Sequence, residues 1–115
     1  MEAVILVLND VELLQEVIRA WESVGIRGIT ILKSSGLGRI SNAMYRDDAP
    51  LFPSLSEIFE QEELSHRTLM SVVDSSSVDK LIAATEQITG PLAKPNTGFL
   101  FTLPVGRVVG YTHPE

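Results

Sequence analysis

The strongest constraint on the fold is a pair of short stretches that hardly alternate between apolar and polar residues. Ala3–Leu8 is a continuous apolar run rich in branched side chains, and Phe99–Leu103 is nearly as apolar. Both resemble buried β-strands in length and composition. A strand packed on one face only should alternate apolar and polar side chains, so we expect both faces of these strands to be covered.

Two segments between these strands have helical periodicity. From Val11 to Val24, apolar residues recur at spacings of three and four, and Gly25 follows where a left-handed cap can end the helix. Trp21 belongs to this apolar stripe and is predicted to lie in the core. A second helical stripe runs over residues 78–88 and ends at Gly90.

The remaining strands complete a recognisable order. Ile26–Lys33 and Arg67–Val73 are rich in the residues typical of strands. Phe99–Leu103 is the last strand, and its two aromatic side chains are predicted to be core. The order strand, helix, strand, strand, helix, strand predicts an α+β, ferredoxin-like βαββαβ sandwich. Its antiparallel sheet should carry both helices on one face.

The two central strands are separated by a long insert, residues 34–66, rather than by a hairpin. Connections of this length are usually functional. Within it, Ser54 is placed to cap a short helix over Leu55–Glu63. We expect His66 to be exposed where the insert rejoins the sheet.

The second face of the sheet therefore needs a cover. Fully burying one large apolar side chain stabilises a fold by about 1.5–3 kcal/mol, and soluble monomers rarely expose a large apolar patch. Either the insert or another subunit can supply the cover, and we favour assembly into an oligomer.

Composition narrows the class of protein. With 115 residues and 44% hydrophobic content, the chain is expected to form one domain over residues 1–115. Its net charge of −6 argues against binding nucleic acid or an anionic membrane. The chain has no cysteine, and its apolar opening run is too short to span a bilayer, so we expect a cytoplasmic protein.

Two segments resemble the PII signal-transduction (nitrogen regulatory protein P-II) family. Residues 24–31, Val-Gly-Ile-Arg-Gly-Ile-Thr-Ile, followed by Gly36-Leu37-Gly38-Arg39, are similar to the family's Gly-x-x-Gly-Met-Thr-Val and Gly-Phe-Gly-Arg segments. Thr89-Gly90 and then residues 98–107, Gly-Phe-Leu-Phe-Thr-Leu-Pro-Val-Gly-Arg, resemble the family's second-half loop and last strand. The resemblance covers nearly the whole chain except the predicted insert helix.

The resemblance implies a homotrimeric regulator with effector sites in the clefts between subunits. It also implies that the insert, like the family's long loop, contacts a protein target through residues 40–63 and is ordered by the effector. The residues that it places at the effector site are Thr30, Gly36, Gly38, Arg39, Gly90, Lys94 and Gly98.

Several family positions differ in this chain. Ile40 stands where the family has a Gln tied to 2-oxoglutarate and magnesium. The family's Lys after the last glycine of the second-half loop is missing, since Phe99 follows Gly98, and the family's two last arginines fall at Gly110 and Thr112. Each charge-assisted hydrogen bond contributes roughly 1.5–3 kcal/mol, so losing about three of them weakens triphosphate binding at least a thousandfold. We therefore do not expect 2-oxoglutarate or Mg²⁺, retain an adenine nucleotide as a candidate, and expect a smaller or less charged effector.

Two alternatives stay open on sequence grounds. One is a trimer resembling the divalent-cation tolerance proteins, which share the fold, although the two histidines stand far apart and no metal-ligand spacing is present. The other is a small enzyme of the same fold. No nucleophile, base and acid arrangement can be argued from the spacing, so we expect no enzyme.

Overall fold

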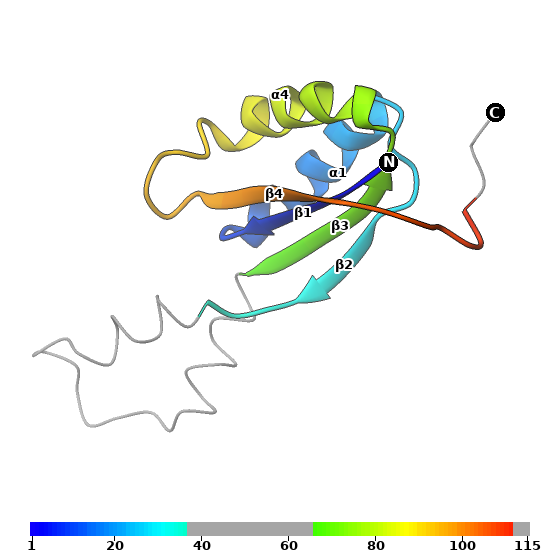
Figure 1. Cartoon of the computed structure of the whole chain (residues 1–115). Helices are drawn as coiled ribbons and strands as arrows, with labels where there is room; N and C mark the ends of the chain where they lie inside the picture. Colours follow the sequence, from blue (N-terminus) through cyan, green and yellow to red (C-terminus); the bar gives the residue numbers. More distant parts are fainter. Residues whose placement is uncertain (37–65, 112–115) are drawn as a thin grey trace, which may run out of the picture.

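The computed structural model describes residues 1–36 and 66–111. In chain order the elements are β1 (Glu2–Leu8), α1 (Leu14–Ser23) after a 3₁₀ turn over Val11–Leu13, β2 (Thr30–Lys33), β3 (Arg67–Val73), α4 (Val78–Thr89) after a 3₁₀ turn over Ser75–Ser77, and β4 (Gly98–Pro104). The strands form one sheet in the order β2-β3-β1-β4, and each neighbouring pair is antiparallel. Both helices lie on one side of the sheet (Figure 1), which confirms the predicted ferredoxin-like α+β fold.

Glycines end both helices as the sequence predicts. Gly25 follows α1 with a φ of 92°, and Gly90 caps α4 with a φ of 78°. Side chains other than glycine rarely adopt these positive φ values, so each glycine lets the chain leave its helix without strain.

The second strand is shorter than predicted, because β2 begins at Thr30 rather than at Ile26. The backbone N–H of Ile26 donates to the carbonyl of Trp21 at 3.0 Å, which ties this residue to the end of α1 instead of to the sheet. Its side chain is nevertheless buried in the core. Burial, rather than strand pairing, accounts for the apolar residue at this position.

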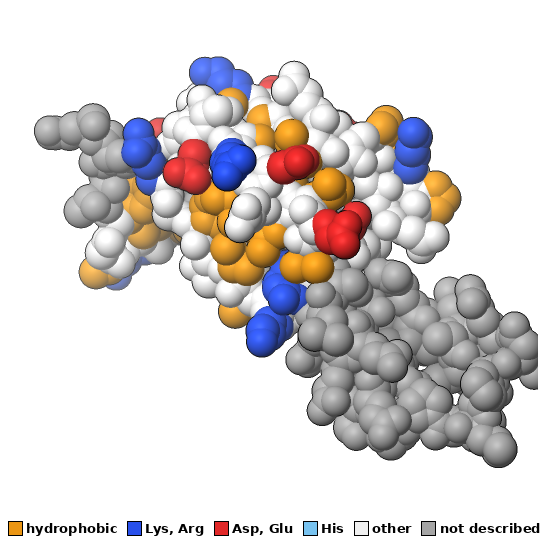
Figure 2. Space-filling model, turned by 180° about the vertical axis from the view of Figure 1, so that it is seen from behind, with side chains coloured by type: hydrophobic (Ala, Val, Ile, Leu, Met, Phe, Trp, Pro, Cys, Tyr) orange, Lys and Arg blue, Asp and Glu red, His pale blue; other side chains and the backbone are white. Residues whose placement is uncertain are grey.

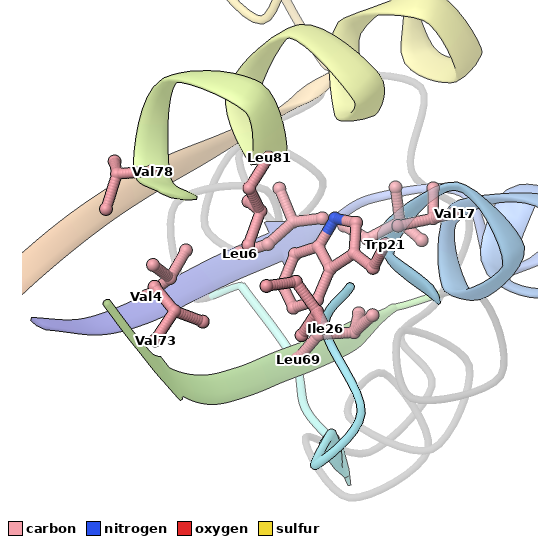
Figure 3. Close-up of a cluster of buried hydrophobic side chains, with 10 residues drawn as sticks. Val4, Leu6, Val17, Trp21, Ile26, Leu69, Val73, Val78 and Leu81 are labelled. Carbon is pink, nitrogen blue, oxygen red and sulfur yellow. The ribbon is translucent and has the colours of Figure 1, made fainter. Parts of the chain in front are cut away.

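The core fills the layer between the helices and the sheet and centres on Trp21, as predicted. The indole is fully buried, and Leu6, Leu69 and Leu81 pack with it in one cluster (Figure 3). Its Nε1 donates to Thr85 Oγ1 on α4 at 2.8 Å, and that hydroxyl donates to the Leu81 carbonyl at 2.7 Å. This buried chain of hydrogen bonds joins the two helices without leaving the indole N–H unsatisfied.

The opposite side of the sheet, which we call the open face, is largely apolar. Residues that are directly paired across neighbouring strands have their side chains on the same face of the sheet. The register places the following residues on the open face: Thr30 and Leu32 of β2, Thr68, Met70 and Val72 of β3, Ala3, Ile5 and Val7 of β1, and Phe99, Phe101 and Leu103 of β4. Neither face of β1 is polar, as the lack of alternation predicts.

The largest side chains of the open face remain accessible in the single chain. Phe99 is 56% exposed, Leu103 52%, Leu32 46% and Phe101 41%. The prediction that the two aromatics of the last strand are core residues is therefore wrong for one chain, because they point away from the helices. Their rings stack on each other with centroids 5.9 Å apart.

On the face drawn in Figure 2, Lys and Arg side chains lie among acidic, apolar and other side chains. In the described ranges, no helix is both long and apolar enough to cross a membrane.

The packing of β4 on β1 can be tested by a substitution at Gly98, the first residue of β4. Its φ is 134°, and a Cβ built there would lie 2.2 Å from the Val7 carbonyl oxygen. We expect Gly98→Ala to lower the free energy of unfolding by about 2–4 kcal/mol, because it adds a backbone clash to an unfavourable φ. Chemical denaturation measures this. Gly106→Ala is the control, because a Cβ there meets nothing within 4 Å; equal stability of the two variants would contradict the close approach.

Candidate functional site

Polar residues gather at the end of the sheet where β1 and β2 finish and β3 and β4 begin. They line a cavity of about 410 Å³, which we call the strand-end cavity. Its lining residues are Val7, Asn9, Ser34, Ser35, Gly36, His66, Thr68, Asn96, Gly98 and Phe99. The antiparallel register brings these residues together, because each lies within or next to the end of its strand.

A chain of hydrogen bonds forms one wall of this cavity. A hydrogen bond of 2.6 Å joins Ser34 Oγ and His66 Nδ1, and Thr68 Oγ1 donates to Ser34 Oγ at 2.9 Å. His66 is only 3% exposed, so the expectation of an exposed histidine is wrong. The Ser34 N–H also donates to the His66 carbonyl at 3.5 Å, so the backbones of the two residues continue the β2–β3 pairing beyond the strands.

The opposite wall comes from the loop before β4. Asn96 has a φ of 63°, and among the described residues it is the one non-glycine with positive φ. Asparagine tolerates this left-handed conformation better than most residues. The backbone N–H of Asn9 donates to the Thr97 carbonyl at 3.5 Å, so the loops after β1 and before β4 are tied together beside the cavity.

The structure brings together only part of the predicted effector site. Gly36 and Gly98 both line the strand-end cavity. Thr30 instead lines a separate hollow of about 460 Å³ on the open face, beside Ile5 and Met70.

The other predicted positions lie elsewhere. Gly90 is the C-cap of α4, and Lys94 is exposed in the following turn, where its N–H donates to the Pro91 carbonyl at 3.1 Å. Gly38 and Arg39 fall outside the described residues, as do the predicted contact segment, residues 40–63, and the predicted helix over 55–63.

Sequence reasoning missed most of the polar lining of the cavity. Asn9, Ser34 and Ser35 directly follow strands, and Asn96 shortly precedes one. A polar residue next to a strand end could have been used to predict this lining. In an antiparallel sheet, the end of one strand lies beside the start of its neighbour, so residues that follow one strand and precede the next come close together. His66 has the same position, because it directly precedes β3, but its burial depends on pairing across the insert.

The cavity is suited to hydrogen bonding rather than to metal binding. Hydroxyls, side-chain amides and an imidazole line it, and these groups both donate and accept hydrogen bonds. No cluster of three His, Cys, Asp or Glu side chains that could hold a metal ion is found in residues 1–36 and 66–111.

Comparison with known proteins identifies the family. The chain matches the profile described as Nitrogen regulatory protein P-II over residues 1–113. Because this match spans nearly all of its length, the chain belongs to the P-II family and is a PII-like regulatory protein. A comparison with curated protein sequences gave no match.

Ser34 is expected to stabilise the buried imidazole. Ser34→Ala removes the partner of His66 Nδ1 and of Thr68 Oγ1, and leaving a buried polar group unsatisfied costs about 1–3 kcal/mol. We expect a loss of that size in chemical denaturation. Ser75→Ala, an exposed hydroxyl in the turn before α4, should change stability by less than about 0.5 kcal/mol. Similar values for both variants would argue against the network.

Proposed function

We propose that this P-II protein is a homotrimeric, cytoplasmic regulator without enzymatic activity. In this proposal a small effector binds in the clefts between subunits, near the strand-end cavity and Thr30. Residues 40–63 then contact a target protein, whose activity the effector-bound state changes. Ligand-dependent regulation of this kind requires the effector to bind one state of the protein better than the other.

The observation that carries the proposal is the open face of the sheet. Leu32, Phe101 and Leu103 are each between 41% and 52% exposed on it, and half-buried apolar residues surround them. Removing apolar surface from water stabilises an assembly by about 25 cal/mol per Å². Copies of the same chain offer identical apolar faces, and closed symmetry lets a small number of copies cover one another completely.

Membership of the P-II family also supports the proposal. The family is described as a nitrogen regulatory protein, and the match over residues 1–113 covers both the strands of the open face and the loops of the cavity. The cation-binding alternative lacks a comparable observation, because residues 1–36 and 66–111 hold no group of three His, Cys, Asp or Glu side chains that could bind a metal ion.

A substitution at Phe101 can test whether the chain assembles into a trimer through the open face. Phe101→Ser places a polar side chain in the middle of the open face, opposite Ile5, and we expect the trimer to dissociate to monomer at micromolar concentration. Light scattering after size exclusion, with circular dichroism to confirm folding, measures this. Ile31→Ser is the control, because Ile31 is equally exposed, at 41%, but pairs with the core residue Leu69 on the other face. A monomeric wild type would refute the proposed trimer.

The family's charged ligands provide a second test. Because Ile40 replaces the Gln, we expect the addition of millimolar 2-oxoglutarate and Mg²⁺ to leave the unfolding midpoint at its value with ATP alone. A ligand present at a hundred times its Kd would stabilise by about 2.7 kcal/mol and raise the midpoint by several degrees. A rise of that size would show that other groups replace the missing contacts.

A further inference from the structure

A second cavity lies at the end of the sheet opposite to the strand-end cavity. The turn between α1 and β2 forms one of its walls, and the end of β3 with the turn before α4 forms another. Figure 1 shows these segments beside the N-terminus. We call it the β3-end cavity. At about 340 Å³ it falls within the range of small-molecule sites, roughly 300–1,000 Å³. None of the described residues predicted for the effector site lines it, so it is a separate feature of the chain.

Two side chains of opposite charge line the β3-end cavity from different walls. Arg27 belongs to the turn before β2, and Asp74 directly follows β3. Both residues are exposed. Within the part of the chain that the structure describes, neither side chain takes part in an ion pair or a hydrogen bond. The cavity therefore presents a cation and an anion that do not neutralise each other.

The carboxylate of Asp74 is available although its position favours an internal bond. Asp74 is the N-cap residue of the 3₁₀ turn before α4 and has an extended backbone. An aspartate at this position usually accepts a hydrogen bond from a backbone N–H of the following turn. Asp10, in the equivalent position before α1, does so from the Glu12 N–H at 3.0 Å, whereas the side chain of Asp74 makes no such bond. Both carboxylate oxygens of Asp74 can thus accept from a ligand.

The turn that carries Arg27 is anchored on both sides. The Ile26 N–H donates to the Trp21 carbonyl at 3.0 Å, and the Ile26 side chain is buried. On the other side, Ser71 Oγ of β3 donates to the Gly28 carbonyl at 2.6 Å. The backbone of Arg27 is therefore held in place between two fixed neighbours, which lowers the entropic cost of binding a ligand there.

We propose that the β3-end cavity binds a free α-amino acid as a second small ligand of this protein. At neutral pH an α-amino acid carries a carboxylate and an ammonium group on the same carbon, which matches a cavity with one cation and one anion. Arg27 would donate two N–H groups to the carboxylate, and Asp74 would accept from the ammonium group. A ligand with a single charge would leave one of the two residues without a partner. Because both residues come from one chain, the site does not depend on the proposed trimer.

The test uses the full-length protein and amino acids from which one charge at a time is removed. L-Leucine and L-asparagine have nearly the same shape and represent apolar and polar side chains. Each is compared with its N-acetyl derivative, which lacks the ammonium group, and with its α-amide, which lacks the carboxylate. In calorimetry we expect at least one of the two amino acids to bind, and each of its derivatives to bind at least fivefold more weakly.

Two variants assign the charges of the ligand to residues. Arg27→Gln and Asp74→Asn each remove one charge and should weaken binding of the amino acid at least fivefold. In Arg27→Gln the amino acid and its amide should bind equally, and in Asp74→Asn the amino acid and its N-acetyl derivative should bind equally. Arg19→Gln and Asp79→Asn are the matched controls, because both residues are exposed and neither lines the cavity. They should leave the affinity within twofold.

Three results would overturn the inference: no binding of either amino acid at millimolar concentration, equal affinities for an amino acid and its singly charged derivatives, or binding that neither cavity variant weakens. Sedimentation of the same samples separates this inference from the proposed function. A monomer that binds an amino acid would reject the trimer and keep the site. A trimer that binds neither amino acid would keep the assembly and reject the site.

Discussion

A four-stranded sheet has two faces, and the two helices of this chain cover only one of them. The buried bond from Trp21 Nε1 to Thr85 Oγ1 fixes the helices to each other above that face. Val4, Leu6 and Leu8 are fully buried beneath them, whereas Ile5 and Val7 lie on the open face. The apolar character of both faces of β1 is therefore not satisfied within the described part of the chain, and this constraint is the physical basis of the proposed assembly.

The register that creates the open face also positions the strand-end cavity. Val7 pairs with both Thr68 and Phe99, so the polar end of β3 and the aromatic start of β4 flank the same residue of β1. β4 lies so close to β1 at Gly98 that a Cβ there would collide with the Val7 carbonyl, so glycine permits this approach. A shift of one residue would exchange the two faces of β4 and destroy both features.

Local patterns in the sequence predict the elements well, and contacts between distant segments account for what they miss. Arg67–Val73 is a strand with the predicted ends, and Gly25 ends the first helix. By contrast, the start of β2 depends on the hydrogen bond from Ile26 to Trp21, and the burial of His66 depends on Ser34 across the insert. Of the predicted site residues that the structure describes, only Gly36 and Gly98 line the same cavity, because periodicity does not tell which loops share an end of the sheet.

Two separate observations bear on the charge of the proposed effector. The sequence lacks cationic side chains at positions 110 and 112, and Ile40 replaces a polar family residue. Independently, hydroxyls, amides and an imidazole line the strand-end cavity without any Lys or Arg among its described residues. Burying an anion without a partner costs several kcal/mol, whereas neutral hydroxyl groups lose little on entering such a site. The fold of the family is therefore kept here, while the described lining of the strand-end cavity consists of hydroxyl, amide, imidazole and apolar groups.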